Sequence, residues 1–272
     1  MRRRKESVGF GYPSCGFPQH HPSLLENKMR KTLVFAVIAL MAASAQAAIE
    51  YDLTYDGAIK TVNAAIYMQW DIAPAGSGLI NSFVGIQGTG GGSQHGYNTT
   101  GVREFDTTSN SKALLLSTIP TVTFGETDYR EFWLDINQNS THPVLSLDKL
   151  RIHVASVSNL TGYLTNPAFG APIYDLDAGG DNYVKLDYRL NPGSGGGDML
   201  LFVPNSAFTG AENYNPTGNN YIYLYSMCGA TINGADGFEE WAVGNGAPII
   251  PEPATIALLA LGGFALLRKR YS

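Results

Sequence analysis

Cysteine is nearly absent from this sequence of 272 residues, which contains only Cys15 and Cys228. Two cysteines rule out a small scaffold that is stapled by several disulfides. If Cys15 lies in a leader that is removed, the mature chain keeps a single thiol. We expect Cys228 to be a small buried side chain beside the Tyr-rich strand 221–225, and the alternatives are an intermolecular bridge or lipid attachment.

Charged residues are also scarce, at 15% of the chain, and many of the basic ones gather at the two ends. Between residues 48 and 250, eight Lys and Arg residues stand against twenty Asp and Glu residues, a net charge of −12. So acidic a region repels nucleic acid and anionic lipid. We therefore predict no nucleic-acid partner; cations, basic partners or simple solubility are the interpretations that remain.

The sequence lacks the motifs of common hydrolases. His95, His142 and His153 stand in no Gly-x-Ser-x-Gly elbow, His-Glu-x-x-His pair or Cys-His setting. The alternation around His153 predicts a solvent-exposed residue on a strand. Glu239 and Glu240 are adjacent, so on a strand they point to opposite faces and cannot flank one glycosidic bond. We predict no catalytic residues and no enzymatic activity.

The N-terminal region has the pattern of a secretion signal. A basic stretch begins at Met29, an apolar run follows, and Ala45 and Ala47 occupy the two small positions of an Ala-x-Ala cleavage pattern. This pattern predicts a signal peptide at residues 29–47, cut by signal peptidase after Ala47. Residues 1–28 fit no part of it, and we interpret them as a mis-started or an extended leader.

The C-terminal end carries a more specific pattern. Pro251, Glu252 and Pro253 precede an uncharged apolar run at residues 254–267, and the basic cluster 268–270 follows. As a helix this run measures about 21 Å, which is short of the roughly 30 Å hydrocarbon core of a bilayer. The basic cluster favours a cytoplasmic end. We predict a short C-terminal hydrophobic helix that makes transient membrane contact, with a plain transmembrane anchor as the alternative.

This arrangement resembles the PEP-CTERM sorting signal of bacterial proteins, over residues 250–270. The resemblance implies that residues 251–272 are a sorting tail and that an exosortase, a membrane protease-transpeptidase, acts near Pro251–Pro253. It also implies an exported protein of the cell surface, outer membrane or extracellular matrix. Exosortase and signal peptidase are then the partners during export, and exopolysaccharide is the partner expected afterwards.

The central region alternates apolar and polar residues with a period of two, which is typical of half-buried strands. Residues 150–154 show the pattern, and in residues 221–225 Tyr alternates with Ile and Leu. Clusters of Gly and Asn separate such segments. We predict an all-β fold, a two-sheet and jelly-roll-like β-sandwich, over residues 48–241, with residues 242–250 as a spacer.

From Glu131 onward the sequence is also similar to the β-rich ectodomains of planctomycete-type PEP-CTERM proteins. The segments that carry this similarity are residues 132–138, 145–152, 174–187 and 237–243. The similarity implies no activity.

Two loops have the oxygen spacing of calcium-binding loops. Their candidate ligands are Asp175, Asp177 and Asp181 in one loop and Asp135, Asn137 and Asn139 in the other. Neither loop has the glutamate that closes an EF-hand, because those positions are Leu186 and Ser146. The alternative is a turn whose Asx side chains accept hydrogen bonds from local backbone amides. Calcium is the one cofactor that the sequence suggests.

Trp70, Trp133 and Trp241, with the Tyr-rich strand, are candidates for a sugar-stacking surface, because aromatic faces cover the apolar side of a pyranose. The alternative is that these rings fill the space between two sheets. The sequence therefore favours an exported, non-catalytic surface or matrix protein sorted by exosortase. A carbohydrate-binding module is the alternative, and an extracellular hydrolase is disfavoured.

Overall fold

The computed structural model describes residues 47–70, 82–88, 92–193, 196–234, 237–244 and 246. The predicted leader, the signal peptide up to Gln46 and the tail 251–272 lie outside these residues, and so do the predicted C-terminal helix and the remainder of the spacer. Ala47 is exposed, and the first strand begins two residues later, at Ile49.

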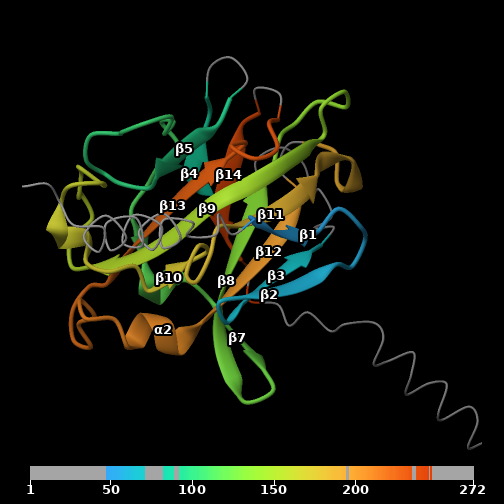
Figure 1. Cartoon of the computed structure of the whole chain (residues 1–272). Helices are drawn as coiled ribbons and strands as arrows, with labels where there is room; N and C mark the ends of the chain where they lie inside the picture. The colour runs from blue at the N-terminus through green and yellow to red at the C-terminus, as the bar shows by residue number, and fades with distance from the viewer. Residues whose placement is uncertain are drawn as a thin grey trace, which may run out of the picture. The chain divides into compact units, whose positions relative to one another are not determined.

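One of the two sheets, called sheet A, has the strand order β1-β11-β9-β13-β5. Its long central strands, β9 and β13, run antiparallel to each other, whereas β1 and β11 are parallel. Two short strands, β10 and β6, extend it by pairing with β9 and β13. The strands are β1 (Ile49–Asp52), β5 (Gln94–Tyr97), β6 (Leu114–Leu115), β9 (Val144–Ala155), β10 (Tyr174–Asp175), β11 (Asn182–Asp187) and β13 (Tyr221–Cys228) (Figure 1).

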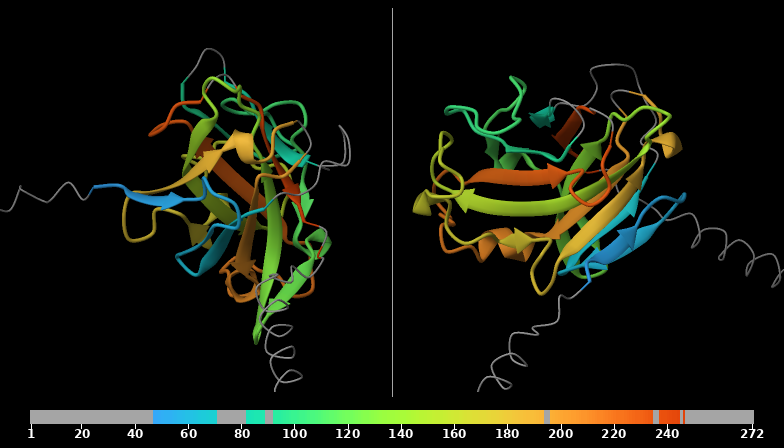
Figure 2. Two further views of the ribbon diagram at one scale, coloured as in Figure 1. Left: turned by 90° about the vertical axis from the view of Figure 1, so that its right-hand side faces the viewer. Right: turned by 45° about the horizontal axis from the view of Figure 1, so that its top comes forward.

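The other sheet, sheet B, has the order β2-β3-β12-β8-β14-β4, and β7 pairs with β8. Its strands are β2 (Ile59–Val62), β3 (Ala65–Gln69), β4 (Ser82–Ile86), β7 (Thr121–Phe124), β8 (Thr127–Asp135), β12 (Met199–Pro204) and β14 (Glu239–Val243). The chain changes sheet repeatedly, for example between β8 and β9 and on both sides of β13. Figure 2 shows β9 and β13 crossing in front of the strands of sheet B.

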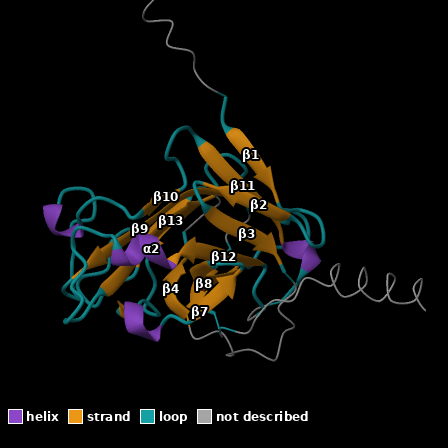
Figure 3. Ribbon diagram, turned by 90° about the horizontal axis from the view of Figure 1, so that it is seen from below, coloured by secondary structure: helices purple, strands orange, loops and turns teal. Residues whose placement is uncertain are grey.

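Among the described residues, the helical segments are short and lie in the connections between strands (Figure 3). They are α2 (Asn205–Thr209) and the 3-10 turns η1 (Leu116–Thr118), η2 (Pro167–Phe169) and η3 (Tyr188–Leu190). In the part of the chain that the structure describes, no helix is long and apolar enough to cross a membrane.

The main hydrophobic core lies between the two sheets and is built from alternate residues of their strands. Sheet A contributes Ile152 of β9 and Leu224 of β13, while sheet B contributes Phe132 of β8 and Trp241 of β14. Because side chains alternate between the faces of a strand, these residues all point inward. The predicted all-β, two-sheet sandwich is confirmed. Cys228 is free and fully buried in this core, as expected, and burial raises the pKa of its thiol well above the usual value.

The expectation that each strand has one buried and one solvent-exposed face is wrong for β13. Tyr223 and Tyr225 point away from the inter-sheet core, yet they are only 1% and 6% exposed. They form a second aromatic cluster with Tyr97, Tyr163 and Phe169 on the outer face of sheet A. The covering loop, which we define as residues 156–173 between β9 and β10, supplies Tyr163 and Phe169. The alternation of β13 could not reveal this cover, because the covering loop lies far from β13 in the sequence.

Candidate functional site

The three tryptophans of the predicted sugar-stacking surface do not come together. Trp241 is fully buried in the inter-sheet core, and its indole Nε1–H donates to Ser226 Oγ at 3.0 Å. Trp133 of β8 and Trp70, directly after β3, are half-buried and pack against a cluster on the outer face of sheet B. Stacking on a sugar requires an open ring face. Trp70 and Trp133 alone retain exposed area for it.

Glu131 links the outer face of sheet B to the start of the spacer. One carboxylate oxygen accepts the Trp133 indole N–H at 2.7 Å and the other accepts the Gly246 backbone N–H at 3.0 Å. Burial raises the pKa of Glu131, and the two hydrogen bonds oppose that rise. The chain that leaves β14 is therefore held against the domain as far as Gly246, five residues before Pro251.

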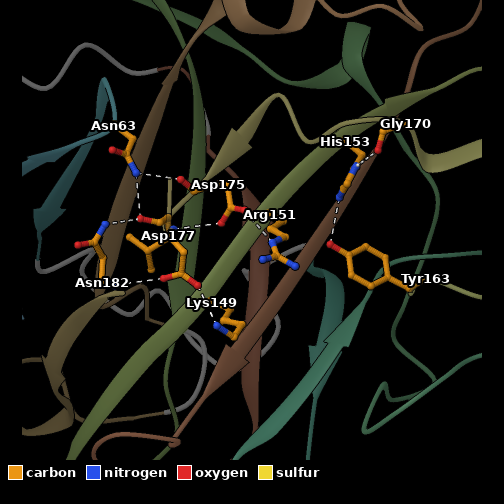
Figure 4. Close-up of polar contacts among 10 residues, drawn as sticks. Asn63, Lys149, Arg151, His153, Tyr163, Gly170, Asp175, Asp177 and Asn182 are labelled. Carbon is orange, nitrogen blue, oxygen red and sulfur yellow. Dashed lines mark hydrogen bonds and ion pairs between the residues drawn. The ribbon is translucent and has the colours of Figure 1, made fainter. Parts of the chain in front are cut away.

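In the first candidate calcium loop, the carboxylates accept hydrogen bonds from neighbouring side chains and backbone amides. Asp175 accepts from Arg151 Nε at 2.9 Å, and Asp177 accepts from Lys149 Nζ at 2.8 Å. Their second oxygens accept the backbone N–H groups of Asp177 and Asn182. These contacts are those of an Asx turn tied to β9 (Figure 4). Asp181, by contrast, is exposed.

The second candidate loop is arranged in a similar way. Asp135 is fully buried at the end of β8, and the Asn137 amide donates to the Phe238 carbonyl. The Asn139 side-chain oxygen accepts the backbone N–H groups of Thr141 and His142. Within the described residues, no group of three or more His, Cys, Asp or Glu side chains is placed to hold a metal ion. Calcium binding stays a prediction for both loops.

Glu239 and Glu240 lie on opposite faces of β14, as their adjacency requires. Glu239 is fully buried, and its oxygens accept hydrogen bonds from the amides of Gln94 and Gln138. Burial raises the pKa of Glu239 to about 8. Glu240 faces the other way and accepts from Ser82 Oγ at 2.8 Å. The two carboxyl groups therefore do not share one site.

A pocket opens on the outer face of sheet A, under the covering loop. Arg151 and His153 line it from β9, Asp175 lines it from β10, and the covering loop supplies Tyr163–Pro167, Phe169, Gly170 and Pro172. Its volume is about 430 Å³, within the range of small-ligand sites. We call it the β9–β10 pocket. The register explains how its charged pair forms, because Asp175 lies directly opposite Arg151 in the antiparallel ladder.

Hydrogen bonds fix the first half of the covering loop on the outer face of sheet A. Glu104 accepts the backbone N–H groups of Gly162 at 2.9 Å and Tyr163 at 3.2 Å, and it accepts the Tyr97 hydroxyl. These bonds, led by that from Tyr97, lower the pKa of Glu104 against the effect of burial. The Tyr223 hydroxyl accepts the Leu160 N–H and donates to the Val157 carbonyl. The loop is thus held by the aromatic cluster beneath it.

The prediction that His153 is solvent-exposed is wrong, since its exposed fraction is 5%. Nδ1 lies 3.2 Å from the Gly170 carbonyl oxygen and Nε2 lies 3.0 Å from the Tyr163 hydroxyl. The contacts fit a neutral imidazole whose Nδ1–H donates and whose Nε2 accepts (Figure 4). Burial lowers the pKa of His153, which favours that form. The sequence analysis missed this pocket because its residues are brought together only by the pairing of β9 with β10 and by the fold of the loop between them.

The match to a known protein family lies in the C-terminal segment, outside the sandwich. Residues 250–270 match the family model described as the PEP-CTERM protein-sorting motif. The chain carries a PEP-CTERM sorting motif. This motif supports export, sorting by exosortase and association with the cell surface. No curated protein and no solved structure matches the chain, so the similarity of the central region to planctomycete-type ectodomains stays a prediction.

Proposed function

We propose that this protein is a non-catalytic component of the cell surface or the exopolysaccharide matrix, which exosortase processes at its PEP-CTERM motif. The motif at residues 250–270 is the observation that carries the proposal. Its position supports it, because β14 ends at Val243 and, among the residues that the structure describes, Gly246 is the last one bonded to the sandwich. In the sequence, the sorting motif thus begins four residues after Gly246.

The arrangement of ionisable groups supports a non-catalytic role. Glu239 is fully buried and points away from Glu240, and both ring nitrogens of His153 are engaged. A general acid or base must be within hydrogen-bond reach of its substrate. Glu239 and His153 are therefore poorly placed to serve a substrate that arrives from solvent.

Intact-mass measurement of the exported protein tests the sorting step. We expect the wild-type protein from its own host to have lost both the signal peptide and the residues that follow the Pro251–Pro253 motif. A variant with Glu252→Ala is expected to keep its tail and to stay with the membrane fraction. Glu240→Ala, a change of the same type in β14, is the matched control and should be processed normally.

Deletion of the exosortase gene should reproduce the result of Glu252→Ala in the wild-type protein. If the wild-type tail is retained in a host with an active exosortase, or removed in a host without one, the sorting proposal is wrong. Fractionation then separates surface from matrix: extraction of the processed protein together with polysaccharide supports the matrix role.

A second candidate function is direct glycan binding, which the β9–β10 pocket favours. Affinity electrophoresis in gels that contain matrix polysaccharide tests it, because a bound protein migrates more slowly. The variants Trp70→Ala and Trp133→Ala test the remaining exposed tryptophans. If the gel retards the wild-type protein and one of these variants equally, that tryptophan is not part of the binding site.

A further inference from the structure

The β9–β10 pocket has unused hydrogen-bonding capacity next to its ion pair. Arg151 carries five N–H donors. The donor on Nε bonds Asp175, and Tyr163 is a second side-chain hydrogen-bond partner of Arg151, which leaves the other donors for a ligand. Each oxygen of Asp175 accepts one hydrogen bond, from Arg151 Nε or from the Asp177 N–H, and each has a second lone pair. Arg151 and Asp175 both line the pocket. Donors and acceptors that lie side by side suit neighbouring hydroxyl groups, each of which both donates and accepts.

The charges of the pocket cancel. Arg151 and Asp175 form an ion pair, and His153 is buried with both ring nitrogens in contact with protein atoms. The neighbouring Lys149 and Asp177 are paired as well. The surrounding region carries a net charge of −12 between residues 48 and 250. Both facts disfavour a polyanion, because no net positive charge attracts it and the domain repels it.

The rim of the pocket is apolar on the side of the covering loop. Leu164 is 72% exposed, and Pro167 and Pro172 are exposed beside it. The rings of Tyr163 and Phe169 are buried beneath, in contact with each other at 5.1 Å between centroids. A ligand with hydroxyls along one edge and C–H groups on one face matches these two sides of the pocket. A pyranose ring has that character.

We propose that the β9–β10 pocket binds one uncharged sugar residue of a neutral glycan. Adjacent hydroxyls of this sugar bond the terminal nitrogens of Arg151 and the carboxylate of Asp175. The apolar face of the ring lies against Leu164 and the neighbouring prolines. This inference rests on the second candidate function, glycan binding, and names its site and its ligand class.

Calorimetric and saturation-transfer NMR titrations of the exported protein test the inference. The probes are cellotriose, isomaltotriose and mannotriose, with trigalacturonate as the charged comparator. We expect one neutral probe to bind with a Kd on the order of 1 mM, as a contact with few heavy atoms allows. Its affinity should change by less than about twofold between low and high salt, because the ligand carries no charge.

Two substitutions locate the binding. Arg151→Lys keeps the positive charge but loses the planar fork of donors, and we expect affinity to fall at least about tenfold. Leu164→Ala removes an exposed apolar contact, with an expected loss of about threefold. Val157→Ala is the matched control: Val157 is also exposed, at 44%, lies in the same loop and does not line the pocket. Its affinity should stay within about twofold of wild type.

Three results would overturn the inference. They are no binding of any neutral probe at about 10 mM, equal affinity in wild type and both pocket variants, and tighter, salt-sensitive binding of trigalacturonate. If Arg151→Lys fails to fold, Leu164→Ala decides, because so exposed a side chain contributes little to stability. If matrix polysaccharide still retards both pocket variants, the glycan-binding function stands but this site is rejected. The mass measurement of tail removal tests the sorting proposal and does not depend on any of these outcomes.

Discussion

The outer faces of the two sheets are both covered by aromatic side chains, but the cover differs. On sheet A the covering loop lies over Tyr223 and Tyr225 and is fixed by Glu104. On sheet B the ring of Phe124 contacts the rings of both Tyr129 and Phe202 directly, with 5.0 Å between the centroids of Phe124 and Phe202. A separate loop over a face brings backbone and polar groups with it, and here it forms a pocket. A face covered by the sheet's own side chains gains only packing.

The largest expected effect tests whether the outer face of sheet B is a true core. Phe202 is 0% exposed, so Phe202→Ala should lower the free energy of unfolding by about 3–5 kcal/mol in urea denaturation. Phe105→Ala is the control, since Phe105 is 43% exposed and should cost about 1–2 kcal/mol in proportion to its smaller buried area. Equal losses in the two variants would mean that the face of sheet B is only surface.

A smaller effect tests the attachment of the covering loop on sheet A. Tyr223→Phe removes the hydroxyl that bonds Leu160 and Val157, and the expected loss is about 1–3 kcal/mol. Amide hydrogen exchange should also become faster in residues 156–166. Tyr221→Phe, a change on the same face of the same strand at a half-buried residue, should leave that exchange unchanged. A uniform change in both variants would contradict the proposed anchoring.

The smallest expected effects are on the pH dependence of stability. Glu104, on the side of sheet A, and Glu131, on sheet B, should change stability in opposite directions as pH rises. The lowered pKa of Glu104 adds stability above the ordinary value of 4.5, and this is lost as pH falls through the lowered pKa. The raised pKa of Glu131 adds stability that is present below 4.5 and is lost as pH rises through the raised pKa.

Thermal unfolding of Glu104→Gln and Glu131→Gln between about pH 3 and pH 8 checks both signs. The deficit of Glu104→Gln relative to wild type should be largest at neutral pH and should shrink in acid. The deficit of Glu131→Gln should be largest in acid and should shrink, or become an advantage, as pH rises. If the stability deficits of the two variants changed with pH in the same direction, the predicted opposite signs for Glu104 and Glu131 would be wrong.

Local alternation was sufficient to predict the inner half of the sandwich. Ile152 and Leu224 face the inter-sheet core because neighbouring side chains on a strand alternate by geometry. The tail could also be predicted, since Pro251, Glu252 and Pro253 before an apolar run form a pattern that needs no fold. Both predictions depend on residues that are close together in the sequence.

The pocket could not be predicted, because it depends on the register of β9 and β10 and on distant contacts that hold the loop over them. Glu104 and Gly162 are 58 residues apart in the sequence, and neither has a motif that indicates the other. His153 has the alternation of an exposed residue, but the covering loop buries it. The Arg151–Asp175 pair likewise required the register of β9 and β10. Asp175 was singled out for its oxygen spacing, whereas the structure places it opposite a guanidinium.

The single free thiol in the described part of the chain can report on opening motions of the sandwich. Cys228 ends β13 and is fully enclosed, and its raised pKa leaves almost none of the reactive thiolate. A thiol-specific dye can reach it only while the neighbouring ladder is open. Once the leader that contains Cys15 is removed, the rate at which the exported protein takes up one dye molecule reports how often the ladder around Cys228 opens.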